Sequence, residues 1–139
     1  MKRYKILFLC HGNICRSPMA EFIMKDLVKK RNLQDRFIID SAAVTTEEIG
    51  NGIYPPAKRK LYEKGIPFDD HRARLITKKE VEENDMVFVM DNFFFLKIFL
   101  SFLVPLATLN IMSNSVVIKS RILSKSFFIA FHRHLLIHH

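Results

Sequence analysis

Cysteine is scarce in this chain, and its scarcity limits both the fold and the setting. Only two of the 139 residues are cysteine, Cys10 and Cys15, and they lie five positions apart. A pair so close in sequence cannot join distant parts of a chain, which excludes a small secreted domain held together by disulfides. The basic stretch 1–4 leads into an apolar run, 6–10, that is too short for a secretory signal. We therefore expect a reduced, cytoplasmic setting.

Acidic side chains are absent after residue 91, so the net charge of +8 is unevenly distributed. Residues 1–92 hold 17 Lys and Arg against 14 Asp and Glu, a net charge of +3, whereas residues 93–139 hold five basic residues and no acid. The basic residues are interspersed with acids or scattered among Phe and Leu, and they form no stripe. The charge therefore does not indicate a nucleic-acid-binding protein, and we expect no nucleic-acid partner.

Residues 93–139 also differ from the rest of the chain in their apolar content. They hold eight of the 13 Phe, one Pro and no Gly. The stretch 93–111 is the one candidate for a membrane span, but its charge-free part, 98–109, has the length of a core helix. We therefore expect no membrane partner.

Residues 1–92 alternate between apolar runs and helical patterns. Short apolar runs that suit strands buried on both faces of a sheet lie at residues 5–10, 37–40 and 86–90. Helical patterns lie between these runs. Strands and helices that alternate at this spacing predict an α/β domain with a parallel sheet and right-handed crossovers.

Particular residues mark where the helices begin and end. Ser17 suits an N-cap, and the proline after it suits the first helical position. One face of this helix is predicted to carry Met19, Phe22, Ile23, Leu27 and Lys30. A second helix is predicted over 55–64, stopped by Gly65. Thr77 and Glu80 form the capping-box pattern of a third.

The segment from the first strand to the first helix is predicted to bind a phosphoryl group. A loop in that position points several backbone N–H groups at one spot, and the helix dipole adds positive potential there. Gly12 permits backbone geometry that a side chain would forbid. Such a nest binds a tetrahedral oxyanion. The phosphate-binding residues predicted here are His11, Gly12, Asn13, Ile14, Cys15 and Arg16.

Cys10, at the base of this nest, is the candidate nucleophile because positive surroundings favour its thiolate. Arg16, six residues on, can curl back and donate in a planar, bidentate way to two phosphoryl oxygens. Attack by the thiolate yields a phosphocysteine, which water cleaves in a second step. Cys-x5-Arg alone arises often by chance, and a buried Cys is usually only a small apolar residue. The strand, the glycine, the Ser-Pro pair and the helix around it make the pattern restrictive.

This segment resembles the signature of the low-molecular-weight protein tyrosine phosphatases. Residues 10–21, CHGNICRSPMAE, match the family pattern C-x-G-N-x-C-R-S-P. The resemblance continues through residues 40–42, 65–66, 71–74 and 90–92, about two-thirds of the chain. It implies a parallel four-stranded sheet with flanking helices and hydrolysis of phosphotyrosine in proteins, without metal or cofactor. It also implies that Cys10 is the nucleophile and Arg16 the phosphate clamp.

The resemblance implies supporting roles as well. Ser17 would hydrogen-bond the Cys10 thiolate, and a polar network that holds the loop in shape would consist of Asn13, Ser17, Ser41 and His71. Cys15 has two interpretations, which stay open here. It is either a passive loop residue or the partner of Cys10 in a reversible disulfide formed under oxidation.

The substrate wall departs from the better-known family members. Ile14 favours an aromatic ring, whereas the phosphoarginine-specific branch of the family carries Thr at that position. Where many members have Trp or Tyr as a wall, this chain has Glu47, and Tyr54 is the nearest aromatic replacement.

The resemblance ends near residue 92. The family's general acid is an aspartate in a late Asp-Pro-aromatic loop, and no acidic residue follows Asp91 here. We interpret residues 1–92 as a phosphatase-like α/β core and 93–139 as an atypical hydrophobic region of the same domain that arose by a change of reading frame. A divergent but genuine C-terminal region is the alternative. Without the acid, we expect impaired turnover.

Two other functions stay open as alternatives. Thioredoxin-coupled arsenate reductases share this fold and loop, but they use a further cysteine pair downstream and usually carry Ser-Gln after the Arg. Here Pro18 follows Ser17, and no cysteine follows Cys15. The other alternative is a protein that binds phosphate or phosphotyrosine without efficient turnover.

Overall fold

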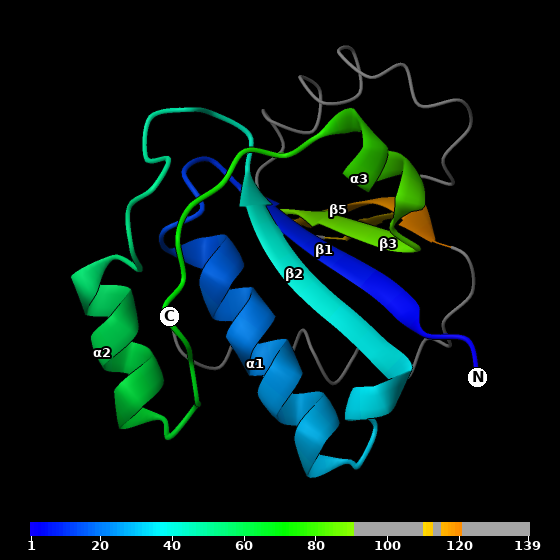
Figure 1. Ribbon diagram of the computed structural model, residues 1–139, viewed down its shortest axis with the longest axis horizontal. Coiled ribbons are helices and arrows are strands. Elements are labelled where there is room, and N and C mark those ends of the chain that lie inside the picture. Colours follow the sequence, from blue (N-terminus) through cyan, green and yellow to red (C-terminus); the bar gives the residue numbers. More distant parts are fainter. Residues whose placement is uncertain (91–109, 113–114, 121–139) are drawn as a thin grey trace.

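The structure, a computed structural model, describes residues 1–90, 110–112 and 115–120. In chain order its elements are β1 (Tyr4–Cys10), α1 (Arg16–Lys30), the 3-10 helix η1 (Gln34–Arg36), β2 (Phe37–Ala43), α2 (Pro55–Glu63), α3 (Lys78–Glu83), β3 (Met86–Val89), β4 (Asn110–Met112) and β5 (Ser115–Ser120). Figure 1 shows α2 beside α1, and α3 on the other side of the strands.

β1 lies at the centre of three parallel strands, as the sequence predicts for an α/β domain. It pairs in parallel with β2 on one side, where Cys10 lies opposite Ala43, and with β3 on the other, where Leu9 lies opposite Val89. The carboxyl ends of all three strands therefore meet at one edge of the sheet. That edge is where α/β proteins place their ligands.

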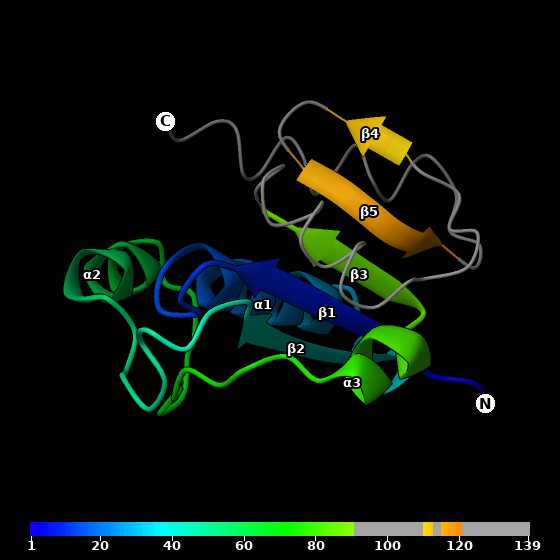
Figure 2. The ribbon, with the colours of Figure 1, turned by 90° about the horizontal axis from the view of Figure 1, so that it is seen from above.

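The prediction of a fourth parallel strand is wrong for the residues that the structure describes. The sheet order is β2-β1-β3-β5-β4, and β5 pairs with β3 in the antiparallel direction (Figure 2). β4 and β5 also pair antiparallel, with two residues between them. A connection that short joins only antiparallel neighbours, because parallel strands need a long crossover. Most of 93–139 lies outside the described residues.

Two apolar layers cover the two faces of the sheet. On one face, Ala20, Met24 and Val28 of α1 pack against a cluster that includes Phe8 of β1. On the other face, Val81 of α3 packs with alternate residues of the same strands. The four residues 6–9 of β1 are at most 1% exposed, which explains their continuous apolar sequence.

The prediction of which face of α1 is buried against the sheet is largely wrong. Met19, Ile23 and Leu27 are only partly buried and Lys30 is exposed, whereas Ala20, Met24 and Val28 form the core contact; Phe22 is buried as predicted. Apolar residues lie almost all round this helix, so their spacing does not determine which face packs on the sheet. The predicted N-cap at Ser17 is also wrong. The helix begins at Arg16, Cys15 occupies the N-cap position without a side-chain cap, and the Ser17 hydroxyl contacts the Cys10 sulfur instead.

The predicted ends of the other helices are confirmed. α2 ends before Gly65, which has a φ of 64°; the Gly65 N–H bonds the Tyr62 carbonyl and the Ile66 N–H bonds the Leu61 carbonyl. These are the two bonds of a Schellman motif. Thr77 and Glu80 form the capping box that opens α3. Among the described residues, no helix is long and apolar enough to cross a membrane.

Candidate active site

The loop between β1 and α1 is held by bonds to its outward-facing carbonyl groups. Five of its carbonyl oxygens accept a bond from a neighbouring group: Cys10 from the Val44 N–H (3.1 Å), His11 from the Thr45 N–H (3.2 Å), Asn13 from the His71 imidazole (2.7 Å), Ile14 from the Tyr54 N–H (2.7 Å) and Cys15 from the Met19 N–H (3.1 Å). The described peptide bonds are all trans. Because a trans peptide points its N–H away from its C=O, the partner N–H groups face the space that the loop encloses. That geometry is an oxyanion nest.

The strained backbone position of the loop is Asn13, and the sequence-based role for Gly12 is wrong in this respect. Asn13 has a φ of 57°, in the left-handed region, whereas Gly12 does not. Asparagine tolerates this region better than other side chains do. Gly12 is required for a different reason, since a Cβ atom there would lie 2.8 Å from Cγ of Glu48. Its missing side chain lets the neighbouring turn approach the loop.

A buried polar network lies beneath the loop and reaches the candidate nucleophile. The Cys10 Sγ is 3.0 Å from the Ser17 hydroxyl, and the Asn13 N–H donates to the same sulfur at 3.3 Å. The Asn13 Nδ2 donates to the hydroxyl oxygens of Ser17 (2.8 Å) and Ser41 (2.9 Å). All three polar residues are 0% exposed. The structure thus brings together Asn13, Ser17 and Ser41 as predicted, and His71 joins them through the Asn13 carbonyl.

The ends of this network determine the direction of its hydrogen bonds. The Arg74 N–H can only donate, and it bonds Oδ1 of Asn13 at 3.2 Å, so the Asn13 NH₂ group must face the two serines. Ser41 donates its own hydrogen to Glu21 at 2.5 Å. Ser17 accepts from Asn13 in the same way, and its hydrogen is left to point at Cys10 Sγ. A hydroxyl that donates to this sulfur stabilises the thiolate.

Two members of the network were not singled out in the sequence analysis. Glu21 is a buried carboxylate, 4% exposed, that accepts from Ser41 and from Nζ of Lys25 at 2.5 Å. A signal for it was available, because Glu21 lies four residues after Ser17 and therefore on the same side of the helix. Arg74 is distant in sequence from every residue that it contacts in the loop, and no local pattern indicates its role.

The Arg74 side chain fixes the segment that carries its N–H group. Its guanidinium bonds Asp40 at 2.8 Å and Glu80 at 2.6 Å. Burial acts to lower the pKa of Arg74, but the two carboxylates outweigh it and raise the pKa. Burial likewise acts to raise the pKa of Glu80, but bonds from the Thr77 backbone and from Arg74 lower it overall. Helix α3 is thereby tied to the segment that orients Asn13.

The predicted clamp, Arg16, lies exposed at the first position of α1. Its Nη1 donates to the Met90 carbonyl at 3.1 Å, at the end of β3. The guanidinium is therefore beside the loop, at the edge where the parallel strands end. Its bidentate grip on a phosphoryl group stays a prediction.

Cys15 is the second thiol of the loop and is half-buried. Burial raises the pKa of the Cys15 thiol, the nearby Cys10 raises it further, and Arg16 partly opposes both. Cys15 is therefore held as a neutral thiol, and the more reactive sulfur of the pair is expected to be Cys10.

The predicted substrate wall lies next to the loop. Oε2 of Glu47 is 2.6 Å from Nε2 of His11, and Tyr54, whose N–H bonds Ile14, is 49% exposed. In the described part of the chain, no group of His, Cys, Asp and Glu side chains could hold a metal ion. Asp91 and the region expected to hold the general acid lie outside the described residues.

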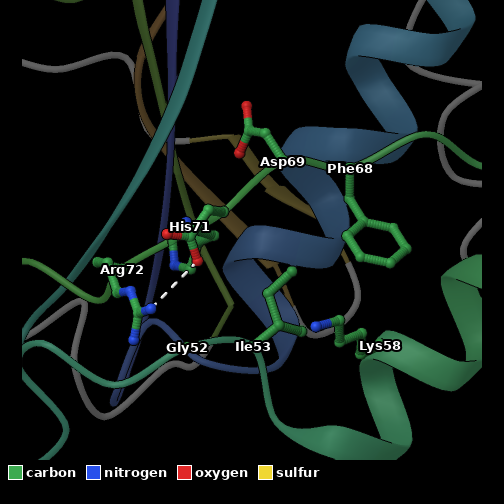
Figure 3. A pocket seen from close by; sticks show the side chains of 8 residues that line it. Gly52, Ile53, Lys58, Phe68, Asp69, His71 and Arg72 are labelled. Atoms are coloured by element: carbon green, nitrogen blue, oxygen red, sulfur yellow. Dashed lines mark ion pairs between the residues drawn. The ribbon is translucent and has the colours of Figure 1, made fainter.

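A cavity of about 450 Å³ lies beside the loop and shares one residue with the network. Its lining includes Gly52, Ile53, Lys58 of α2 and the segment 68–72 (Figure 3). His71 lines the cavity and also holds the Asn13 carbonyl. The cavity is thus a neighbour of the oxyanion nest.

Comparison with known proteins agrees with this geometry. A model of the low molecular weight phosphotyrosine protein phosphatase family matches residues 5–100. The chain is 40% identical over 86 residues to the low molecular weight protein-tyrosine-phosphatase YfkJ of Bacillus subtilis, which is 62% of this chain and 55% of that protein. It is 43% identical over 89 residues to the human low molecular weight phosphotyrosine protein phosphatase, 62% of this chain and 54% of that one.

Solved structures agree as well. The crystal structure of YfkJ from B. subtilis matches with a TM-score of 0.69 and 34% identity over 71% of this chain and 62% of that one. The crystal structure of DARP, a drosophila arginine phosphatase, matches with a TM-score of 0.63 and 39% identity over 70% and 59% of the two chains. This chain spans about half the length of the curated relatives it matches. It belongs to the low molecular weight phosphotyrosine protein phosphatase family.

Proposed function

We propose that this protein hydrolyses phosphotyrosine in proteins through a phosphocysteine intermediate on Cys10. The observation that carries the proposal is the arrangement around the sulfur: the Ser17 hydroxyl and the Asn13 N–H both lie within hydrogen-bond distance of it. Thiolate attack on phosphorus forms the S–P bond and breaks the bond to the tyrosine oxygen, which leaves as the phenol after taking up a proton. Water then attacks phosphorus, and the thiolate leaves with both donors in place to stabilise it.

The loop supplies the electrostatic part of this reaction. Its inward N–H groups are preorganised for the phosphoryl oxygens, because their peptide carbonyls are all held from outside. In the proposed complex Arg16 moves from the Met90 carbonyl to the phosphoryl group and provides the bidentate charge that a lysine cannot reproduce. The proposed phosphate-binding set is therefore residues 11–16.

The proposed activity is slow with natural phosphotyrosine. No Asp or Glu follows Asp91, so the aspartate that protonates the leaving oxygen in this family has no counterpart in 93–139. A general acid is typically worth about 10²–10⁴-fold in rate. We further propose that 1–92 is the phosphatase-like core, that 93–139 is an atypical region of the same domain, and that the protein works in a reducing, cytoplasmic setting. The two free thiols are consistent with that setting.

The test is a series of aryl phosphates whose leaving groups rise in pKa from a nitrophenol towards the tyrosine phenol, near 10. We expect slow turnover of p-nitrophenyl phosphate, a trapped phosphocysteine on Cys10, and a rate that falls steeply along the series. A shallow dependence would show that another group supplies the proton. Phosphopeptide affinity with no covalent intermediate and no turnover would instead support the binding-protein alternative. Arsenate reduction has no candidate for the downstream thiol relay, since Cys15 is the last cysteine.

A further inference from the structure

The mouth of the loop carries an exposed hydrogen-bonded pair, His11 and Glu47, that the proposed reaction does not use. Nε2 of His11, the residue directly after Cys10, lies 2.6 Å from Oε2 of Glu47. The Glu47 side chain is 68% exposed and that of His11 is 38% exposed. A carboxylate has two oxygens, and the bond to His11 uses only one of them. A negative group therefore stands in solvent at the edge of a nest built for anions.

The turn that carries Glu47 is attached firmly to the loop. Both the N–H (3.2 Å) and the hydroxyl (3.1 Å) of Thr45 bond the His11 carbonyl. The next residue after Glu47 approaches so closely that a Cβ atom on Gly12 would clash with it. Glu48 is itself engaged, accepting from Asn51 at 2.7 Å. Glu47 is thus held beside the phosphate site by contacts of Thr45 and Glu48, which do not depend on its own side chain.

A carboxylate in this place is unfavourable for a phosphate dianion unless the substrate brings a compensating cation. We infer that Glu47 is a specificity-determining residue that selects phosphotyrosine with Lys or Arg close to it in sequence. The inference rests on the proposed phosphatase function. Tyr54, which is 49% exposed beside Ile14, offers an apolar surface for the substrate ring. Glu47 offers a negative charge for the basic residues that flank the phosphotyrosine.

The expected size of the substrate preference follows from the exposure of Glu47, because any pair that it forms with a basic substrate residue is also exposed. Exposed ion pairs are worth about 0.2–1 kcal/mol, and charges at the rim of an interface act mainly on association and selectivity. Glu47 attracts a basic flank and repels an acidic one. Both effects raise the ratio of kcat/KM for a basic-flanked peptide to kcat/KM for an acidic-flanked peptide. We expect roughly a fivefold preference in kcat/KM at low salt, which shrinks as ionic strength rises.

The experiment uses the whole 139-residue chain and two phosphotyrosine peptides that differ only in flanking residues, Lys in one and Glu in the other. We expect the Lys peptide to be favoured by the wild type, the preference to collapse in Glu47→Gln, and the order to reverse in Glu47→Lys. The matched control is Glu63→Gln, at a second exposed glutamate at the far end of α2, whose side chain is 58% exposed and paired with Lys60. This control should keep the wild-type preference.

The outcomes separate this inference from the proposed function. Turnover of p-nitrophenyl phosphate with equal kcat/KM for both peptides would overturn the role of Glu47 and leave the phosphatase intact. Absence of turnover with every aryl phosphate would overturn the proposed function, and the two peptide affinities, measured by titration, would then decide the role of Glu47. A preference for the Lys peptide that survives Glu47→Lys would also overturn it.

Discussion

The two sides of the phosphate loop each hold a glutamate in a short hydrogen bond, yet the two sites differ in burial. Beneath the loop, Glu21 is 4% exposed and accepts from Ser41 at 2.5 Å. At the rim, Glu47 is bonded to His11 at 2.6 Å and its side chain is 68% exposed. Burial strengthens an ionic hydrogen bond and makes its loss costly, whereas water screens an exposed one. The difference shows that bond length alone does not tell how much each contact contributes to stability.

This contrast assigns different tasks to the two sides. The buried side holds the hydroxyl of Ser17 beside the Cys10 sulfur. The rim modulates which substrate reaches that sulfur. Changes beneath the loop should therefore alter stability and chemistry strongly, and changes at the rim should alter selectivity weakly.

The largest effect is expected from the nucleophile itself. Cys10→Ser should abolish turnover of p-nitrophenyl phosphate, because a serine hydroxyl in this nest is not ionised at neutral pH. Binding of inorganic phosphate should persist, since the nest consists mainly of backbone N–H groups. Steady-state assays and phosphate titrations would measure the two properties. Residual activity equal to the wild type would contradict the mechanism.

A matched pair of substitutions tests the contrast directly. Glu21→Gln should lower the free energy of unfolding by about 1.5–3 kcal/mol, because it removes a buried charged acceptor and turns an NH₂ group towards one of the two donors, Ser41 or Lys25. Glu47→Gln should lower it by less than about 1 kcal/mol. Urea denaturation of both variants and the wild type gives the numbers. Equal losses in the two variants would refute the distinction between the buried and exposed sides.

A smaller, pH-dependent effect is expected at the tie between α3 and the loop. The pKa of Glu80 is lowered in the folded protein, so its stabilising contribution is complete above its unfolded value, near 4.3, and is lost as the pH falls through the lower folded value. Glu80→Gln should therefore cost on the order of 1 kcal/mol at pH 7 and less at pH 3, below the unfolded value. Urea melts at both pH values measure the difference. A cost that does not change with pH would show that the carboxylate charge is not the source.

The smallest effect on turnover is expected at Cys15. Its raised pKa keeps it neutral, so Cys15→Ser should change turnover of p-nitrophenyl phosphate by less than about threefold. If Cys15 protects Cys10, peroxide should inactivate the wild type reversibly, through a disulfide that dithiothreitol reduces, and the variant irreversibly. Mass spectrometry of the oxidised proteins distinguishes the products. Sulfonic acid on Cys10 as the main product in the wild type would leave Cys15 a passive residue.

Much of the core could be predicted from the sequence because the signals are local. The apolar run in β1, the capping box of Thr77 and Glu80, and the stop at Gly65 each depend on a few neighbouring residues, and all are confirmed. The loop could be recognised for the same reason. The buried face of α1 could not be predicted, because apolar residues lie almost all round the helix. Only packing against the sheet determines which of them are buried.

What the sequence by itself determined is therefore the strand, the loop and the helix around Cys10, along with the family to which they belong. Only the tertiary structure decided how Asn13 and Ser41 are oriented beside Ser17, because the groups that orient them come from distant parts of the chain. Ser41 lies 20 residues from Glu21, and Arg74 lies 61 residues from Asn13, yet each pair is within hydrogen-bond distance. Such pairs form only when the parallel strands place their carboxyl ends at one edge and exclude water from it. Once water is excluded, each donor must find an acceptor, and the direction of every bond in the network follows.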